Sequence, residues 1–249
     1  MSDGERVRRV PLLTVDTEFL DAIPEAERNH AAGLVHVARV DRSAGTRWPN
    51  ASELMQERDG VAAIVLDGLV AREVSLAGRV SVELYGPGDV LDGDDTSEQS
   101  TSWRVHDSTV LAVLDEPFVV ASRRWPGLWQ VLLRRSQTRA GRLTAHLAAL
   151  QLSRVELRIV AVLWQLAERW GRVTGDGVVI PVPLTHHLLG QLVGARRPTV
   201  SLGLSNLAEQ NLLHRRDDGG WLLAPESSRL LGGSSPADSS DDSSSLAAA

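Results

Sequence analysis

The stretch from residue 184 to residue 213 constrains the fold more than any other part of this chain. It reads LTHHLLGQLVGARRPTVSLGLSNLAEQNLL, and its apolar residues recur with the period of two short helices. Those residues are Leu184, Leu188, Leu189 and Leu192 in the first helix, and Val200, Leu204 and Leu207 in the second. Gly194 supplies the tight corner between the helices, because glycine tolerates a positive φ. The pattern predicts a helix-turn-helix.

The second helix of this pair begins with side chains that suit nucleic acid. Arginine, threonine and serine there can donate hydrogen bonds to phosphates and base edges, and Pro198 is acceptable in a first turn. An ordinary corner of two helices in a protein core would satisfy the apolar pattern alone. The glycine corner, the Arg-Arg-Pro-Thr start and a hairpin that follows favour DNA recognition over that alternative.

On these residues the segment resembles the Crp/Fnr family of bacterial transcription regulators. The matching residues are Gln191, Val193, Gly194, Arg197, Thr199, Val200, Ser201, Leu204, Leu207, Leu212 and Leu213. The resemblance implies a homodimer that reads palindromic double-stranded DNA, with a β-roll of the cyclic-nucleotide-binding type in front and a long dimerisation helix between. RNA polymerase is a further candidate partner.

We expect nine residues to contact DNA: Thr185, Arg196, Arg197, Thr199, Ser201, Leu202, Ser205, Arg215 and Arg216. By the resemblance, Arg197 matches the arginine that reads guanine O6 and N7, with a phosphate contact as the alternative. Thr185 can cap the first helix, face a phosphate, or do both. Arg215 and Arg216 lie on the hairpin, or wing, where they can follow the DNA backbone or be solvated.

Two positions depart from the family pattern. Pro198 stands where the family has an acidic base-reading residue, and Leu202 stands where it usually has a basic one. We therefore expect this chain not to read the family's best-known operator. Leu202 can touch a thymine methyl group or pack against the protein.

The charge of the chain is unevenly distributed. The formal net charge is −6, and every basic side chain is arginine. Between Glu116 and Glu156 the chain has no acidic residue but seven arginines: Arg123, Arg124, Arg134, Arg135, Arg139, Arg142 and Arg154. We expect this run to be locally positive, so the total charge does not exclude DNA binding.

The whole pattern predicts an α+β protein with a jelly-roll-like N-terminal β-roll. We expect a sensor-type β-roll at 1–121, a dimerisation helix at 122–152, a winged helix-turn-helix at 153–226 and a disordered tail at 227–249. The residues from about 11 to 120 read as short strands at 61–66, 69–74, 80–85 and 109–114, with a hairpin turn at Asp67-Gly68.

The helical segment at 128–152 has apolar residues at Leu128, Val131, Leu132, Leu143, Leu147 and Leu150. This stripe can pair with a second copy of the helix or cover the barrel. Ser153 and Glu156 have the spacing of a capping box for the next helix.

The cyclic-nucleotide site that the resemblance implies is not recognisable. The stretch 90–103 holds Asp92, Asp94, Asp95 and Glu98 and no base, with Ser100 near the expected arginine position. An anionic phosphate would be repelled there, so cyclic AMP is not the expected effector, and the effector stays unknown. The acidic loop can chelate a hard cation or simply be solvated. Haem ligation by His30, His36 or His106 is a further alternative. We expect no cofactor and no metal.

Other function classes find little support. There is no apolar run long enough for a transmembrane helix, and the N-terminus lacks the apolar core of a signal peptide, so we expect a cytoplasmic protein without a membrane partner. Cysteine is absent, which excludes thiolate metal sites. No nucleophile elbow or phosphate-binding glycine loop occurs, so we do not expect an enzyme. The alternative function is a β-roll sensor or enzyme whose helical C-terminal part mediates protein contacts.

Overall fold

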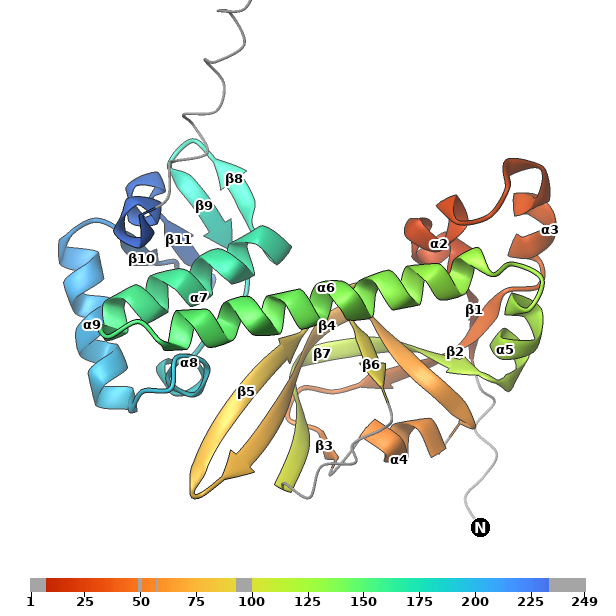
Figure 1. Cartoon of the computed structure of the whole chain (residues 1–249), viewed down its shortest axis with the longest axis horizontal. Helices are drawn as coiled ribbons and strands as arrows, with labels where there is room; N and C mark the ends of the chain where they lie inside the picture. The colour runs from red at the N-terminus through yellow and green to blue at the C-terminus, as the bar shows by residue number, and fades with distance from the viewer. Residues whose placement is uncertain (1–7, 49–50, 57, 93–99, 233–249) are drawn as a thin grey trace, which may run out of the picture. The chain divides into compact units, whose positions relative to one another are not determined.

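The computed structural model describes residues 8–48, 51–56, 58–92, 100–232. The chain packs as two units, which divide at Gly141 and Arg142. The first unit holds an antiparallel sheet with helices on it, and the second holds a helix-turn-helix with a small sheet (Figure 1). The predicted α+β fold, with a β-rich N-terminal part, a long helix and a C-terminal helix-turn-helix, is confirmed.

The strands of the first unit form one antiparallel sheet, seven-stranded among the described residues. Its main order is β1-β2-β7-β4-β5, while β3 pairs with β7 and β6 with β4. The strands are β1 (Arg9–Pro11), β2 (His36–Arg42), β3 (Arg47–Trp48), β4 (Gly60–Leu76), β5 (Arg79–Tyr85), β6 (Val90–Asp92) and β7 (Ser100–Asp115).

The predicted hairpin turn at Asp67-Gly68 is wrong. The strand β4 runs straight through both residues, and its register against β7 shifts on either side of Asp67. Gly68 adopts a φ of 89°, and a Cβ there would lie 2.3 Å from the carbonyl oxygen of Ser108. The glycine therefore marks a β-bulge inside a long strand, where the neighbouring backbone approaches closely. The actual turn between β4 and β5 lies at Ala77 and Gly78, both with positive φ.

Helices replace strands in part of the N-terminal region. They are α1 (Leu12–Val15), α2 (Thr17–Asp21), η1 (Glu25–Glu27), α3 (Arg28–Ala32) and α4 (Ala51–Gln56). The expectation of strands from residue 11 onwards is wrong for these segments, because helices of three to six residues carry too little periodicity to be read from sequence. Two longer helices follow the sheet: α5 (Glu116–Ser122) and α6 (Gly127–Leu150).

Both faces of the sheet are buried. In β4, Ile64 belongs to the core formed with the helices, while its neighbours Ala63 and Val65 belong to a second core inside the roll. On β7, Ala112 likewise belongs to the core formed with the helices, and Leu111 belongs to the core inside the roll. Side chains alternate between the two faces of a strand, so a sheet covered on both sides needs continuous apolar runs. This explains the uninterrupted apolar runs at 61–66 and 110–114.

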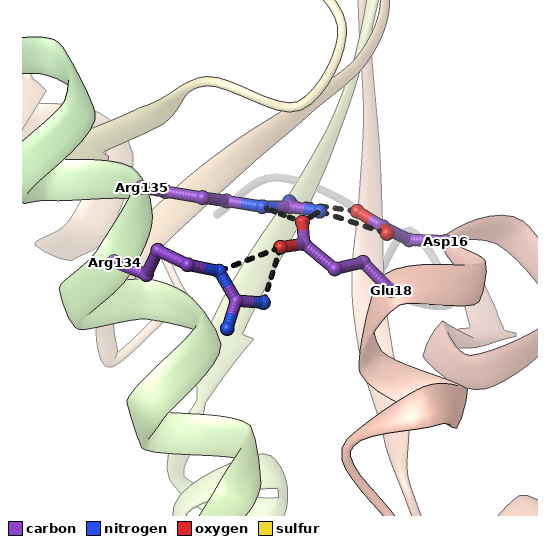
Figure 2. Close-up of polar contacts among 4 residues, drawn as sticks. All are labelled: Asp16, Glu18, Arg134 and Arg135. Atoms are coloured by element: carbon purple, nitrogen blue, oxygen red, sulfur yellow. Dashed lines mark hydrogen bonds and ion pairs between the residues drawn. The ribbon is translucent and has the colours of Figure 1, made fainter. Parts of the chain in front are cut away.

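Carboxylates of the N-terminal helices meet arginines of α6 (Figure 2). Arg135 donates to Asp16 at 2.7 and 2.9 Å and also to Glu18, and its guanidinium lies 4.9 Å from the centre of the Phe19 ring. Arg134 binds the other oxygen of Glu18. The pairs fasten α2 to α6 within the first unit.

These contacts correct the expected positive run. Arg124 pairs with Glu27, Arg134 and Arg135 pair with Glu18, and Arg139 binds Glu83 of β5 at 2.7 Å. Carboxylates far away in the sequence therefore neutralise four of the seven arginines, whereas the nine predicted DNA contacts all lie in the second unit.

The second unit begins with the end of α6 and contains α7 (Val155–Trp170), α8 (His186–Leu192) and α9 (Arg197–Glu209). Its sheet has the order β10-β11-β9-β8, built from β8 (Arg172–Thr174), β9 (Gly177–Ile180), β10 (Leu213–Arg215) and β11 (Trp221–Leu223). The 3₁₀ helix η2 (Pro225–Leu231) follows. Ser227 of η2 is buried and accepts a hydrogen bond of 3.1 Å from the indole of Trp164, so the expected start of the tail at residue 227 falls inside packed structure.

The predicted capping box at Ser153 is wrong. The helix α7 begins one residue later than that box requires, with Arg154 at the N-cap position and no side chain capping it. The carboxylate of Glu156 is instead engaged by Asn206 of α9, at 3.0 Å.

Candidate nucleic-acid interface

The two helices of the predicted motif are α8 and α9 (Figure 1). Thr185 caps α8, since its hydroxyl oxygen accepts a hydrogen bond of 3.1 Å from the backbone N–H of Leu188. Gly194 has a φ of 64°, as a tight corner requires. The apolar residues predicted to face inward, Leu184, Leu188, Leu189 and Leu192, are all buried. The helix-turn-helix read from the sequence is confirmed in its helices, its cap and its corner.

The helix α9 presents two different faces. Val200, Gly203, Leu204 and Leu207 are buried. The exposed side carries five of the predicted contact residues: Arg196, Arg197, Thr199, Leu202 and Ser205. Arg196 is the N-cap residue with an extended backbone, and Arg197 is the first residue of the helix. Leu202 is 63% exposed, so it does not pack within the unit and is available to a partner.

Two serines of α9 already have hydrogen-bond partners. The hydroxyl of Ser201 lies 2.9 Å from Nδ1 of His186, which is the first residue of α8. The hydroxyl of Ser205 donates to the carbonyl oxygen of Ser201 at 3.1 Å. The hydroxyl oxygen of Ser205 can therefore accept a hydrogen bond from a partner. Whether the hydroxyl of Ser201 donates or accepts depends on His186.

The wing is the hairpin of β10 and β11, as predicted. Arg215 donates to the carbonyl oxygen of Leu184 at 3.3 Å, and its guanidinium lies 5.2 Å from the centre of the Trp221 ring. Arg216 pairs with Asp218 at 3.0 Å. The hydrogen bond from the backbone N–H of Gly220, followed by that from Arg216, lowers the pKa of Asp218. Both wing arginines thus have partners in the protein, which a DNA backbone would have to share or replace.

The helix α7 holds the motif in place. Arg158 donates to the carbonyl oxygen of Val193 at 3.1 Å, next to the Gly194 corner. Glu156 accepts from Asn206, and the hydrogen bond from its own backbone N–H followed by the one from Asn206 lowers the pKa of this carboxyl. These contacts connect α7 to both the corner and the recognition helix α9.

Sequence reasoning missed His186 and Arg158. The helical period offered a signal for His186, because it shares a face with Gly190 and the buried Val193, four and seven residues later. No local signal pointed to Arg158, since its partner lies 35 residues away.

Within the described residues, no three His, Asp or Glu side chains come together in a way that could hold a metal ion. His30, one of the haem candidates, lies beside Arg124, with 3.0 Å between Nε2 and Nη1. The acidic residues Asp94, Asp95 and Glu98 lie outside the described residues. In the described part of the chain, no helix combines the length and the apolar character needed to cross a membrane.

Comparison with known proteins agrees with this geometry. Residues 157–227 match the family model of the Crp-like helix-turn-helix domain. A protein of Mycobacterium tuberculosis, named as a CRP-like cAMP-activated global transcriptional regulator, is 35% identical over 94 residues. That match covers 36% of this chain and 42% of the relative, so the chain spans about two fifths of the length of the curated relative it matches.

Solved structures extend the similarity of fold to most of the chain. A cyclic nucleotide-binding domain containing protein from Listeria monocytogenes is similar with a TM-score of 0.63 at 19% identity, over 84% of this chain and 96% of the other. A CooA variant from Carboxydothermus hydrogenoformans has a TM-score of 0.61 at 18% identity, over 88% and 93%. A CRP-family transcriptional regulator from Thermus thermophilus has a TM-score of 0.59 at 18% identity, over 80% and 99%.

The family model matches residues of the second unit only. The solved structures are similar in fold over most of the chain. Residues 157–227 thus match the Crp-like helix-turn-helix domain model, and the fold of the chain is similar to that of a solved CRP-family transcriptional regulator.

Proposed function

We propose that this protein is a sequence-specific, DNA-binding transcription regulator that acts as a homodimer in the cytoplasm. The observation that carries the proposal is the division of α9 into a buried apolar face and an exposed face with Arg196, Arg197, Thr199, Leu202 and Ser205. A recognition helix needs such a face, because base edges in the major groove are reached by side chains from one side of a helix. Thr185, Ser201, Arg215 and Arg216 complete the proposed contact set.

Within this set, Arg197 is proposed to read a base and Arg196 a phosphate. Arg197 begins the helix, whereas Arg196 precedes it on extended backbone. A guanidinium at the first helical position is aimed at the groove floor, where it can donate to guanine O6 and N7 together. The residue before the helix lies nearer the sugar-phosphate backbone.

The proposed dimer rests on an exposed seam of α6. Trp129, Leu133, Ser136, Ala140, Leu143 and Leu147 follow one another in alternating steps of four and three residues, and each of these side chains is exposed. Leu147 is 61% exposed and Leu133 59%. All of them except Ser136 are apolar, and apolar residues at heptad spacing are the pattern by which two helices pair.

This seam differs from the stripe read from the sequence. Leu128, Val131 and Leu132 lie in the core of the first unit, so they serve the fold. Leu143 and Leu147 remain in the seam, and Trp129 and Leu133 join them. A second copy of α6 is the partner that the seam fits, because palindromic DNA is read by two copies of one recognition helix.

Cyclic AMP is not the proposed effector. Large side chains fill the interior of the roll: Trp103 and Tyr85 are buried, with ring centres 5.0 Å apart, and Leu91 belongs to the same core. A nucleotide bound among these side chains would have to displace them. The proposal includes no enzymatic activity, and RNA polymerase remains a predicted partner.

Duplex binding across a salt series tests the proposal. Wild-type protein should bind a selected duplex with an affinity that falls steeply as salt rises, because phosphate contacts release counterions. Arg197→Ala should lose affinity and base preference, with about 1–3 kcal/mol of discrimination at one base pair. Arg196→Ala should weaken all duplexes alike and flatten the salt dependence.

The reverse pattern for the two variants would exchange their roles. A wild-type protein without salt-sensitive duplex binding would contradict the proposal and favour a sensor or enzyme whose C-terminal part binds proteins.

A further inference from the structure

The imidazole of His186 lies where the recognition helix meets the wing. Its Nδ1 is 2.9 Å from the hydroxyl oxygen of Ser201 on α9. Its ring centre is 6.4 Å from that of Trp221 on β11, at an interplanar angle of 36°. Arg215 of β10 also lies at that indole, 5.2 Å from the ring centre. His186 thus links α8, α9 and the wing, which are the three elements proposed to approach DNA.

The charges around His186 are of one sign. Burial, then Arg215 on β10, then Arg197 on α9, lower the pKa of this imidazole below its ordinary value. On the wing, the carboxylate of Asp218 is taken up by Arg216 and by the N–H of Gly220. The neighbouring His187 on α8 is exposed, and it provides a matched comparison. In the free protein, burial and the two arginines therefore disfavour the protonated form of this imidazole.

We propose that His186 takes up a proton when the protein binds a duplex, and that the protonated ring sets the hydrogen-bonding direction of Ser201. The inference rests on the proposed DNA binding. A phosphate that approaches Arg197 and Arg215 brings negative charge to the same place, and an opposite charge nearby favours the imidazolium form. The proton comes from solvent, and no other bond changes.

Protonation changes what α9 presents to DNA. A neutral imidazole can accept the hydroxyl proton of Ser201 at Nδ1, which leaves the serine oxygen as an acceptor. An imidazolium is a donor at both nitrogens, so its Nδ1–H donates to Ser201. The serine hydroxyl proton is then free to donate to a phosphate or to an acceptor on a base edge. His186 is in this sense a positioning residue for Ser201.

The consequence is a defined pH dependence of binding. The complex has the higher pKa at His186, so duplex affinity should rise as the pH falls between the pKa of the complex and that of the free protein. Outside this window the contribution of His186 is constant. One linked proton per protomer makes two per dimer, which corresponds to a change in duplex affinity of at most about a hundredfold per pH unit.

Calorimetry on the full chain tests the inference. The probe is a duplex selected by the wild-type protein, titrated at constant ionic strength in two buffers of different ionisation enthalpy near pH 7. Wild-type protein and His187→Gln should both take up protons on binding, and the affinity of both should rise between pH 8 and pH 6. His186→Gln should lose this uptake and most of the pH dependence while it keeps salt-sensitive binding.

The outcomes separate the inference from the function on which it rests. Absence of duplex binding at every pH would contradict the proposed function. Binding without proton uptake, or uptake that persists in His186→Gln, would overturn the role of His186. If His186→Gln fails to fold, the wild-type protein alone decides by NMR titration of its imidazole resonances. A histidine whose pKa rises when the duplex is added supports the inference, and unchanged histidine pKa values overturn it.

Discussion

Arg158 of α7 donates a hydrogen bond of 3.1 Å to the backbone carbonyl oxygen of Val193, beside the corner of the helix-turn-helix. Val193 is fully buried, so its carbonyl has no water to replace this donor. A cation at the C-terminal end of α8 is also favourable toward the helix dipole. This side chain therefore ties α7 to the turn that orients α9.

We predict that Arg158→Ala lowers the free energy of unfolding of the second unit by about 1–3 kcal/mol, because a hydrogen bond from a charged donor to a buried acceptor is lost. The loss should weaken binding to all duplexes without changing sequence preference. Urea unfolding and duplex titration measure the two effects. Arg154→Ala is the matched control, since Arg154 is 66% exposed and its contact with Glu156 is long, at 3.7 Å. Equal destabilisation by both variants would contradict the assignment.

Gly190→Ala should disrupt the corner. A Cβ at this position would lie 2.8 Å from the carbonyl oxygen of Ala195, which belongs to backbone and cannot move aside as a side chain can. The N–H of Ala195 also donates to the carbonyl oxygen of Gly190 at 2.9 Å. Moving Ala195 away to relieve the clash would therefore stretch this hydrogen bond. We expect a lower thermal midpoint and weaker duplex binding. Gly175→Ala, in a turn where an added Cβ meets nothing within 4 Å, should leave both near wild type.

Leu143→Glu should convert the dimer to monomers. The substitution places a charge in the apolar seam of α6, where a partner helix would bury it at a cost of several kcal/mol. Ala145→Glu introduces the same charge at an exposed position of the same helix outside the seam. Light scattering at binding concentrations should show a monomer for the first variant and a dimer for the second. A wild-type monomer would remove the basis of this prediction.

Acid should loosen the attachment of the N-terminal helices. Burial raises the pKa of Glu18, but the hydrogen bonds from Arg134 and Arg135 outweigh it, so the pKa lies below its ordinary value of 4.5. A carboxylate with a lowered folded-state pKa stabilises the protein above its unfolded pKa, and this contribution disappears as the pH falls through the folded value.

We therefore expect Glu18→Gln to be less stable than wild type at pH 7 and to approach wild type in acid. Unfolding curves at several pH values measure the difference. Glu25→Gln changes an exposed carboxylate of η1 and should track the wild type throughout. A constant difference between Glu18→Gln and wild type at all pH values would show that the charge of Glu18 is not responsible.

The second unit was the more predictable part, and the reason is physical. Its helices carry an apolar period long enough to read, and Gly194 and Thr185 are residues whose local chemistry specifies a corner and a cap. Asp67-Gly68 shows the opposite case. The same dipeptide suits a hairpin and a bulge, and pairing with β7, more than thirty residues later, decides between them.

Partners distant in sequence also escaped prediction. Arg135 and Asp16 are 119 residues apart, so an acid-free run reads as positive although its charges are neutralised in the fold. Likewise, the exposed seam of α6 could be separated from its buried face only after the core of the first unit was known.

The most direct test of the central claim is the selection of duplexes from a random library by the full-length protein, followed by sequencing. The account predicts enrichment of an inverted repeat whose half-sites are about 34 Å apart between centres, one turn of the double helix. It also predicts that Arg197→Ala enriches a repeat with relaxed preference at one symmetry-related base pair. Failure to enrich any sequence, or enrichment of an isolated half-site without its inverted copy, would contradict dimeric, sequence-specific recognition by α9.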